Sequence, residues 1–479
     1  MSRRIRTRRS SVVLAAALAA LAPRAVVAQS VDHVIPLEDS DPGNVPDSPF
    51  GIRLTPDGLF ALVAIAGEVG GSNNHLVDVI ELGTETVVNR LEVGNFPTDV
   101  AFTLDGAGDV RHVFVANSTD GTVSVFDSIF AGAAVATVPL GGFSFPFGVV
   151  ASPDGDRVYV GSLGNGDVYV IDADPLSGTF ATVVDTFNVP SGVGRMAFAG
   201  PDTLVITHTV FALDFSKGDA YVTVLDPANP ADRDTTLLVL GRPGQFASGQ
   251  DVAVTEDGIA WITVFDSDRL LYALDAATRD VVATIDLGPL AENLQHGIEI
   301  APDGRLAIVT NFVNETISVI DLVTETVIAD VVTDAEPNEV AFSKDGFTAY
   351  VTCQNGGTVN VIRELPPGRL RLTGPGSPSL GESIAYTLSG GERAEAHDFL
   401  FSAFGRGSAV FDGTTTGLRA PLKRFATGVF DLDGVTPSIS RTVPNKPALV
   451  GRKVWFQGRA FYDDGSVRTS NVLTAVVQP

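Results

Sequence analysis

The stretch Pro302-Asp303-Gly304-Arg305-Leu306-Ala307-Ile308-Val309-Thr310-Asn311 contains the unit that decides the fold. Pro-Asp-Gly predicts a tight turn, because Gly adopts the positive φ that other residues resist. The apolar, β-branched run that follows predicts a strand. Residues 296–300 supply a strand before the turn, 316–321 alternate with a two-residue period, and 327–332 form a further strand. Four short antiparallel strands are typical of one propeller blade.

The Asp-Gly turn recurs along the chain at intervals of 42 to 55 residues. Its acids are Asp57, Asp105, Asp154, Asp202, Asp257, Asp303 and Asp345, with Thr203 in place of Gly in the fourth copy. A period of this length is typical of propellers, solenoids and arrays. We therefore expect residues 29–365 to form an all-β, seven-bladed β-propeller of four-stranded antiparallel blades.

The repeats resemble a known family. Their second strands contain strings such as Tyr159-Val160-Gly161-Ser162, Ile308-Val309-Thr310-Asn311 and Tyr350-Val351-Thr352-Cys353, and their third strands end in an acid such as Asp321. This pattern is similar to that of the YVTN family of β-propeller repeats, and the similarity extends over roughly residues 31–365. The resemblance implies an exported bacterial protein built on a seven-bladed propeller.

The last repeat, residues 337–362, supplies only three strands before Leu365-Pro366-Pro367. Residues 31–37 look like the fourth strand of a blade that lacks its first three. We expect this N-terminal strand to complete the last blade, which would close the ring and leave no unpaired sheet edge.

Residues 366–479 lack the repeat and contain short alternating runs such as 383–388, 454–461 and 470–477. These runs predict a small C-terminal β-sandwich-like domain. Its role could be attachment and spacing or carbohydrate binding, and the sequence does not decide between them.

The N-terminus predicts export. Residues 1–28 combine a basic start, an apolar stretch at 12–22 and a plausible cleavage site at Val26-Val27-Ala28, which together indicate a signal peptide. The apolar stretch is too short for a stable membrane anchor, so we expect no transmembrane segment after cleavage. The expected location is the periplasm, the extracellular space or the cell surface, by either ordinary secretion or twin-arginine export.

The composition restricts the partners. The chain has 57 Asp and Glu against 32 Lys and Arg, a formal net charge of −25, which argues against nucleic acid as a partner. Cys353 is the single cysteine, so an intramolecular disulfide is impossible, and the sequence carries no zinc or haem cysteine motif.

Charged residues stand just before the predicted first strands, where they would line the mouth of the central channel: Asp99, Arg195, Asp251, His296 and Glu339. These acids could pair with Arg195 or accept hydrogen bonds between blades. Asp99, Asp251 and Glu339 could instead hold a cation such as Ca²⁺, which prefers oxygen ligands, or the ring could perform acid–base chemistry. His75 and His208 map to the same face and complete the ligand-binding candidates.

This face, here called the first face, carries the loops that enter each first strand and those that join second to third strands. Three connections on this face are longer than in the other repeats, at residues 68–75, 209–219 and 241–250. Long loops on a rigid scaffold often carry binding function. The turns that join first to second and third to fourth strands lie on the opposite, second face.

Three functions remain open. The first is an exported, non-enzymatic scaffold that binds a protein or a glycan, or a small molecule, on the first face. The second is a lactonase-like hydrolase, suggested by its shared seven-bladed architecture, with Arg195, His296 and Glu339 orienting substrate and transferring protons. The third is a periplasmic redox-partner propeller. Nucleophile-elbow, phosphate-loop and dinucleotide motifs are absent, so we assign no catalytic residue.

Overall fold

The computed structural model describes residues 30–37, 48–66, 75–212, 217–241, 247–266, 268–289, 295–363 and 365, together with the backbone of strands between 371 and 476. The predicted signal peptide, residues 1–28, lies outside the described residues. In the part of the chain that the structure describes, no helix has the length and apolar character needed to cross a membrane.

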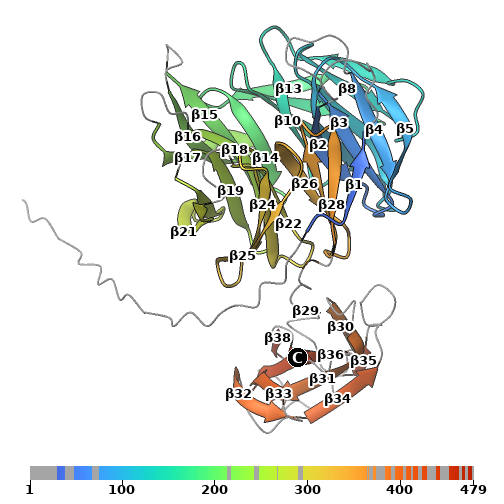
Figure 1. Cartoon of the computed structure of the whole chain (residues 1–479), viewed down its shortest axis with the longest axis vertical. Helices are drawn as coiled ribbons and strands as arrows, with labels where there is room; N and C mark the ends of the chain where they lie inside the picture. Colours follow the sequence, from blue (N-terminus) through green and yellow to red (C-terminus); the bar gives the residue numbers. More distant parts are fainter. Residues whose placement is uncertain are drawn as a thin grey trace, which may run out of the picture.

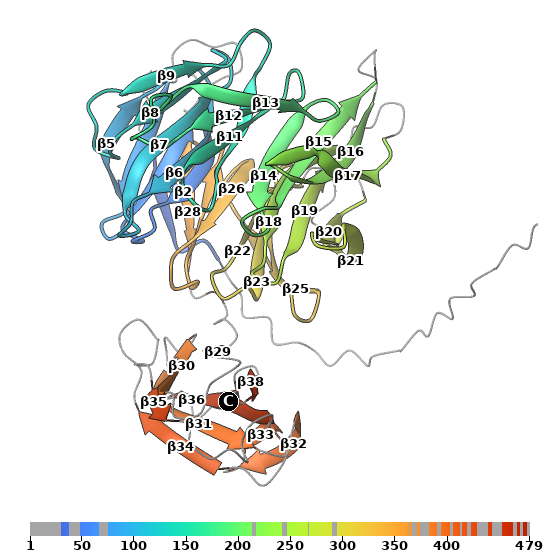
Figure 2. The ribbon, with the colours of Figure 1, turned by 180° about the vertical axis from the view of Figure 1, so that it is seen from behind.

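Seven four-stranded antiparallel sheets surround a central axis, so the chain forms a seven-bladed β-propeller (Figures 1 and 2). Blade 1 contains β2 (Pro49–Leu54), β3 (Phe60–Ile65), β4 (Leu76–Glu81) and β5 (Thr86–Glu92). Blade 2 contains β6 (Pro97–Leu104), β7 (Val110–Asn117), β8 (Thr122–Phe126) and β9 (Ala136–Pro139). Blade 3 contains β10 (Pro146–Ala151), β11 (Arg157–Ser162), β12 (Asp167–Asp172) and β13 (Val183–Asn188). Blade 4 contains β14 (Val193–Phe198), β15 (Leu204–Phe211), β16 (Gly218–Asp226) and β17 (Asn229–Val239). Blade 5 contains β18 (Ser248–Val254), β19 (Ile259–Phe265), β20 (Leu270–Asp275) and β21 (Asp280–Asp286). Blade 6 contains β22 (Gln295–Ile300), β23 (Leu306–Asn311), β24 (Thr316–Asp321) and β25 (Thr326–Val332).

Blade 7 takes strands from both ends of the propeller. Its inner three strands are β26 (Pro337–Phe342), β27 (Ala349–Cys353) and β28 (Thr358–Ile362), and β1 (His33–Pro36) lies antiparallel beside β28. The register places His33 opposite Val361 and Pro36 opposite Thr358. The seven first strands contact one another in a full circle, in which β26 lies next to β2.

The recurring turn has a common chemistry on the second face. In four of the seven turns, a hydroxyl group two residues before the turn acid donates to its carboxylate, as Thr55 does to Asp57 at 2.5 Å and Ser343 to Asp345 at 2.6 Å. The following glycine takes a left-handed conformation, with φ of 75° at Gly346, which explains why glycine recurs there.

Threonines of the second strands join neighbouring blades. The backbone N–H of Glu339 donates to Oγ1 of Thr352, and that hydroxyl donates to the carbonyl of Phe50 in blade 1 at 2.8 Å. Thr207, Thr263 and Thr310 make the same link from blades 4, 5 and 6 to the next blade. The threonine of the repeated string therefore connects blades rather than serving only as a strand former.

The hydrophobic core lies between adjacent blades. Phe114 and Val125 of blade 2, for example, pack with Val149 and Ile171 of blade 3 in one buried cluster. Each blade thus completes its core only against its neighbours, as repeat architectures require.

The segment after residue 371 contains ten further strands: β29 (Arg371–Thr373), β30 (Ser383–Ser389), β31 (Ala394–Ser402), β32 (Arg406–Phe411), β33 (Thr414–Leu418), β34 (Lys423–Gly428), β35 (Ile439–Thr442), β36 (Lys453–Tyr462), β37 (Val467–Thr469) and β38 (Leu473–Val476). β31 pairs with both β34 and β36, and β30 pairs with β29 and β35. That these strands form a sandwich stays a prediction.

Candidate functional site

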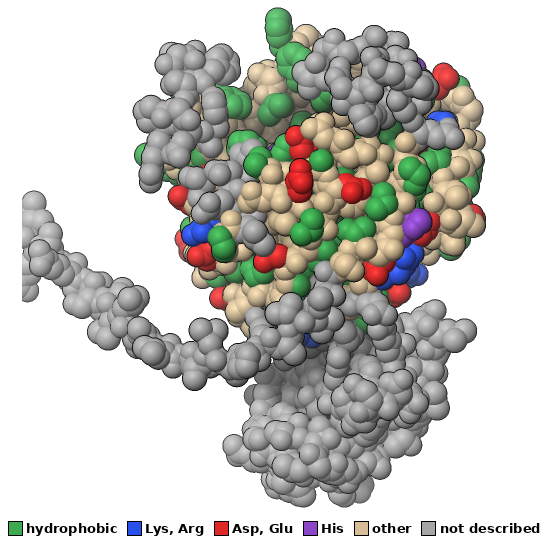
Figure 3. All heavy atoms as spheres, viewed as in Figure 1, with side chains coloured by type: hydrophobic (Ala, Val, Ile, Leu, Met, Phe, Trp, Pro, Cys, Tyr) green, Lys and Arg blue, Asp and Glu red, His purple; other side chains and the backbone are tan. Residues whose placement is uncertain are grey.

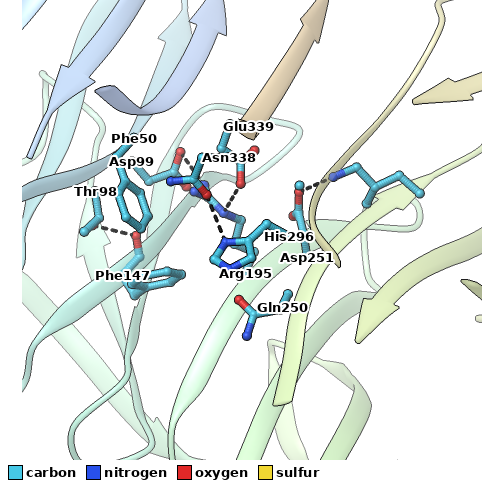
Figure 4. Close-up of polar contacts among 12 residues, drawn as sticks. Phe50, Thr98, Asp99, Phe147, Arg195, Gln250, Asp251, His296, Asn338 and Glu339 are labelled. Atoms are coloured by element: carbon cyan, nitrogen blue, oxygen red, sulfur yellow. Dashed lines mark hydrogen bonds and ion pairs between the residues drawn. The ribbon is translucent and has the colours of Figure 1, made fainter. Parts of the chain in front are cut away.

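The five channel residues that the sequence singles out lie together inside the ring (Figure 4). Their exact position differs from the expectation, because they lie within the first strands rather than just before them. Each first strand carries a register irregularity at this point, such as that between Pro337 and Val340. A bulge redirects side chains, which brings these residues to the channel.

Arg195 is the centre of the cluster. It is only 4% exposed, and it contacts Oδ1 of Asp99 through Nη1 and Oε1 of Glu339 through Nε, both at 2.9 Å. Its guanidinium also lies 5.6 Å from the ring centre of Phe147. Burial opposes the charge of Arg195, but the carboxylates of Asp99, Glu339 and Asp251 raise its pKa above the ordinary value. The arginine is therefore a permanent cation that crosses the channel between blades 2 and 7.

Asp99 and Asp251 each link two blades. Asp99 accepts hydrogen bonds from its own neighbour Val100 and, at 2.9 Å, from the backbone of Val149 in blade 3. Asp251 likewise accepts from Val252 and, at 2.9 Å, from Ile298 in blade 6. Both oxygens of each carboxylate already have partners, which corresponds to the structural alternative that the sequence left open.

One equivalent position in each first strand holds either a glycine or a charged residue. In the order of blades 1 to 7, these residues are Gly51, Asp99, Gly148, Arg195, Asp251, Gly297 and Glu339. A Cβ atom on Gly51 would lie 2.6 Å from the carbonyl oxygen of Thr98, and one on Gly297 would lie 2.5 Å from that of Asn338. Real Cβ atoms do not approach so closely. Glycine therefore allows the next blade to carry its charged residue against the preceding backbone.

His296 is neutral in this environment. Burial, reinforced by the charge of Arg195, lowers the pKa of His296 to about 4, although a hydrogen bond from Nδ1 to Oδ1 of Asn338, at 3.0 Å, opposes the shift. Its ring stacks on Phe312 with centroids 4.6 Å apart and meets Phe265 edge-on. The donor role of Nδ1 leaves Nε2 as an acceptor.

The cluster leaves little free space. Phe50, Phe147, Gln250 and Asn338 line it with the charged residues around a void of about 10 Å³. Within the described part of the chain, Nη2 of Arg195 and Nδ2 of Asn338 are buried without hydrogen-bond partners. A space of this size suits one water molecule that accepts from these groups, and it is too small for an organic substrate.

Two carboxyl groups of this cluster, those of Asp251 and Glu339, have raised pKa values. Burial raises the pKa values of Glu339 and Asp251, and the positive charge of Arg195 only partly reverses the effect. Across the described ranges, no group of three or more His, Cys, Asp or Glu side chains is placed to hold a metal ion.

The two additional histidines do not belong to this cluster. His208 is fully buried in β15, where Nδ1 contacts the carbonyl of Pro190 and Nε2 contacts Oγ1 of Thr223. His75 precedes β4 and accepts a backbone hydrogen bond from Val93. The structure thus brings together five of the seven candidate residues.

The long segments of the first face are only partly described. Residues 68–74 of the first segment and 242–246 of the third lie outside the described residues. In the second segment, 209–219, β15 continues to Phe211 and β16 begins at Gly218, while residues 213–216 lie outside the described residues. The pairing of Phe211 with Gly218 shows that the described residues of this segment extend the β15–β16 pair.

The sequence reasoning did not identify an apolar patch on the first face, here called the aromatic patch, formed by Phe143, Phe145, Leu163 and Phe211. Phe143 is 81% exposed, Phe145 and Leu163 are also exposed, and Phe211 is half-buried. The patch residues meet around two glycines: a Cβ atom on Gly164 would lie 2.6 Å from the Phe145 ring, and one on Gly192 would lie 3.0 Å from Phe211 and 3.3 Å from Leu163. Phe143 and Phe145 adopt positive φ angles of 58° and 40°, which sequence patterns assign to Gly or Asn.

On the side of the propeller seen in Figure 3, acidic side chains are scattered among polar and hydrophobic ones, and few basic side chains are visible.

No protein-family model and no curated protein matches the chain. Among solved structures, hydrazine synthase from Kuenenia stuttgartiensis matches with a TM-score of 0.56 and 20% identity, over 68% of this chain and 97% of that one. At this identity the likeness concerns the fold alone. Fold and site together define a seven-bladed β-propeller protein with a plugged first-face mouth.

Proposed function

We propose that the chain is an exported, YVTN-type propeller scaffold that binds a protein partner through the aromatic patch on its first face. The exposure of Phe143 carries this proposal, because a soluble surface seldom presents a large aromatic side chain beside further apolar ones. Aromatic side chains also dominate the energetics of protein interfaces.

The patch is built to stay in place. Ser144, between the two phenylalanines, is buried and donates from Oγ to the carbonyl of Gly141 at 3.0 Å. The backbone N–H of Leu163 donates to the carbonyl of Phe145 at 3.1 Å. Because these bonds fix the loop, binding would cost little ordering entropy.

A protein is favoured over a glycan by the polar groups nearby. Ser162, Asn165 and Asp167, which flank Leu163 in the sequence, already bond to Ser144, Tyr169 and Asn188. Sugar sites combine an aromatic platform with polar groups that are available to hydroxyls, and these groups are engaged.

The scaffold function is also favoured over a lactonase-like activity at the channel mouth. Arg195 and Glu339 are paired with each other, His296 bonds to Asn338, and the void beside them is about 10 Å³. A substrate could reach these groups only after the cluster had opened. The name of the structural neighbour describes an enzyme, but a likeness at 20% identity concerns the fold alone and does not carry an activity to this chain.

Site-specific crosslinking tests the proposal. A photoreactive amino acid replaces Phe143 or, as the matched control, Leu176, which is 93% exposed but lies in the β12–β13 connection on the second face. In the native host we expect one protein to crosslink at position 143 and not at 176. The purified partner should bind Phe143→Ala/Phe145→Ala at least tenfold more weakly than Leu176→Ala. Equal crosslinking at both positions, or binding of a glycan array in place of a protein, would contradict it.

We further propose that β1 closes the ring as the outer strand of blade 7, which its pairing with β28 supports. Export is supported by the pattern of residues 1–28, and a secreted product that begins at residue 29 would test it.

A further inference from the structure

The second face opens into a cavity that none of the functions above uses. It has a volume of about 790 Å³, and it lies along the carboxyl-terminal halves of the first strands and the turns after them. A volume of this order is typical of small-molecule sites. Its position separates it from the aromatic patch, which lies on the first face.

The sequence explains why the channel is open at this depth. Two residues beyond the plugged ring, each first strand carries a second ring position: Arg53, Ala101, Val150, Ala197, Ala253, Glu299 and Ala341. Alanine and valine occupy five of these positions, so little side-chain volume fills the channel. All but Ala341 line the cavity, and Phe102, Met196 and Phe198 add larger apolar surface.

Of the four carboxyl groups in the channel, that of Glu299 has the weakest contacts with cations and hydrogen-bond donors. Among the described residues, its nearest cation is Nη1 of Arg53 at 3.8 Å, and Nη2 of the same arginine lies 3.8 Å from Asp99. By contrast, Asp99 and Asp251 each accept two backbone hydrogen bonds, and Glu339 contacts Arg195 at 2.9 Å. The side chain of Glu299 remains 36% exposed, so an incoming group can reach it.

The channel contains more acid than base. Two arginines, Arg53 and Arg195, face four carboxyl groups, those of Asp99, Asp251, Glu299 and Glu339. Further acids, Glu256 and Asp303, lie where an adjoining hollow of about 580 Å³ between blades 5 and 6 begins. The ionised carboxylate of Glu299, which has no cation closer than Arg53 at 3.8 Å in the described part of the chain, therefore favours a positively charged occupant.

We propose that this cavity binds a small organic cation with an apolar body, an alkylammonium or arylalkylammonium ion, whose charged group pairs with Glu299. The apolar walls would receive the hydrocarbon part. A divalent metal fits less well, because Ca²⁺ requires six to eight oxygen ligands and the cavity wall offers few. A carboxylate ligand would gain Arg53 but would face the surplus of acids.

The pH dependence of binding has a defined sign. Burial, with the added charge of Asp251, raises the pKa of Glu299 to about 7, while Arg53 opposes the shift. The charged groups around Glu299 are Arg53 on β2, Asp251 on β18 and Glu256 in the turn after β18. Cation binding requires the ionised carboxyl, so the affinity should rise between about pH 6 and about pH 8, where an alkylammonium ion stays charged.

Calorimetry on the propeller-containing full chain tests the proposal with three probes of similar shape: phenethylammonium, 2-phenylethanol and 3-phenylpropionate. We expect the ammonium to bind at least tenfold more tightly than the other two. Glu299→Gln should remove this preference and the pH dependence, while Glu92→Gln, which removes an exposed acid of the outer strand β5 outside the cavity, should leave both unchanged. Ala253→Leu should weaken all probes by filling the cavity, without changing its charge.

The melting temperature of each variant checks its fold. Absence of ammonium binding at millimolar concentration, preference for phenylpropionate, or an unchanged affinity in Glu299→Gln would each overturn the proposal. None of these outcomes depends on the aromatic patch, so the two proposals can fail separately.

Discussion

At the scale of single residues, the channel is organised by charged side chains that serve the backbone. Asp99 and Asp251 occupy equivalent positions and make equivalent bridges to the next blade. They differ in their cation contacts, because Asp99 is touched by Arg195 at 2.9 Å and approached by Arg53 at 3.8 Å, whereas Asp251 makes neither contact. This matched pair separates the contribution of the ion pair from that of the bridge.

We expect Asp99→Ala to destabilise the protein by about 3–5 kcal/mol, because it leaves a buried cation without one partner. Asp251→Ala, which removes a carboxylate that accepts two backbone hydrogen bonds but has no direct contact with Arg195, should cost about 1–3 kcal/mol. Chemical denaturation measures both free energies of unfolding. An equal cost would show that the ion pair adds nothing.

A separate test concerns the cation alternative. If EDTA lowers the melting temperature of the wild type but not of Asp99→Ala, the calcium site predicted from the sequence gains support.

His208 makes acid stability predictable. Burial, assisted by Arg233, lowers its pKa to about 4, although the bond to Pro190 opposes this, while an unfolded histidine titrates near pH 6.5. Between these values the unfolded chain binds more protons, so this residue contributes stability that is lost as the pH falls from about 6.5 to about 4.

His208→Gln should therefore flatten the pH profile. We expect the loss of unfolding free energy between about pH 7 and about pH 4.5 to be about 2 kcal/mol smaller in this variant than in the wild type. His33→Gln, which changes an exposed histidine of β1, is the control. An equal slope in His208→Gln and the wild type would refute the assignment.

At the scale of the element, the short strand β1 is proposed to close the ring through its pairing with β28. Its Ile35 is 1% exposed and packs with Ile52, Val359 and Val361, whereas the adjacent Val34 is 36% exposed. Ile35→Ala should cost about 2–5 kcal/mol and Val34→Ala less than about 1 kcal/mol. Deleting residues 29–40 should lower the melting temperature far more than either, since it exposes the edge of β28. An unchanged melting temperature after deletion would exclude a closing role.

Most elements could be predicted because their signals are local. The alternation of residues 316–321 lies within the strand that it predicts, β24, and the turn is marked by the adjacent residues Asp303 and Gly304, of which Gly304 has a φ of 70°. The exact ends were less predictable. Asp99 lies inside β6 because the strand begins at Pro97, ahead of its bulge, and a bulge depends on the pairing partner.

At the scale of the whole molecule, the ring could be predicted and the surfaces could not. The meeting of Asp99, Arg195 and Glu339 follows from the equivalence of repeats, since equivalent positions of different blades converge on one axis. The aromatic patch depends on left-handed phenylalanines, which carry no sequence signal. The cavity depends on which side chains are small at one depth of seven strands, and this becomes visible only after the blades are aligned.

The antiparallel pairing of β1 with β28 also determines how the propeller would respond to force. The N–H of Asp32 donates to the carbonyl of Val361, so the chain enters and leaves the ring at neighbouring points. Tension applied through the two flanking segments would act on one end of this strand pair. The bonds would then break one after another, as in a zipper, rather than all at once in shear. We therefore expect blade 7 to open first, at low force, before the other six blades unfold.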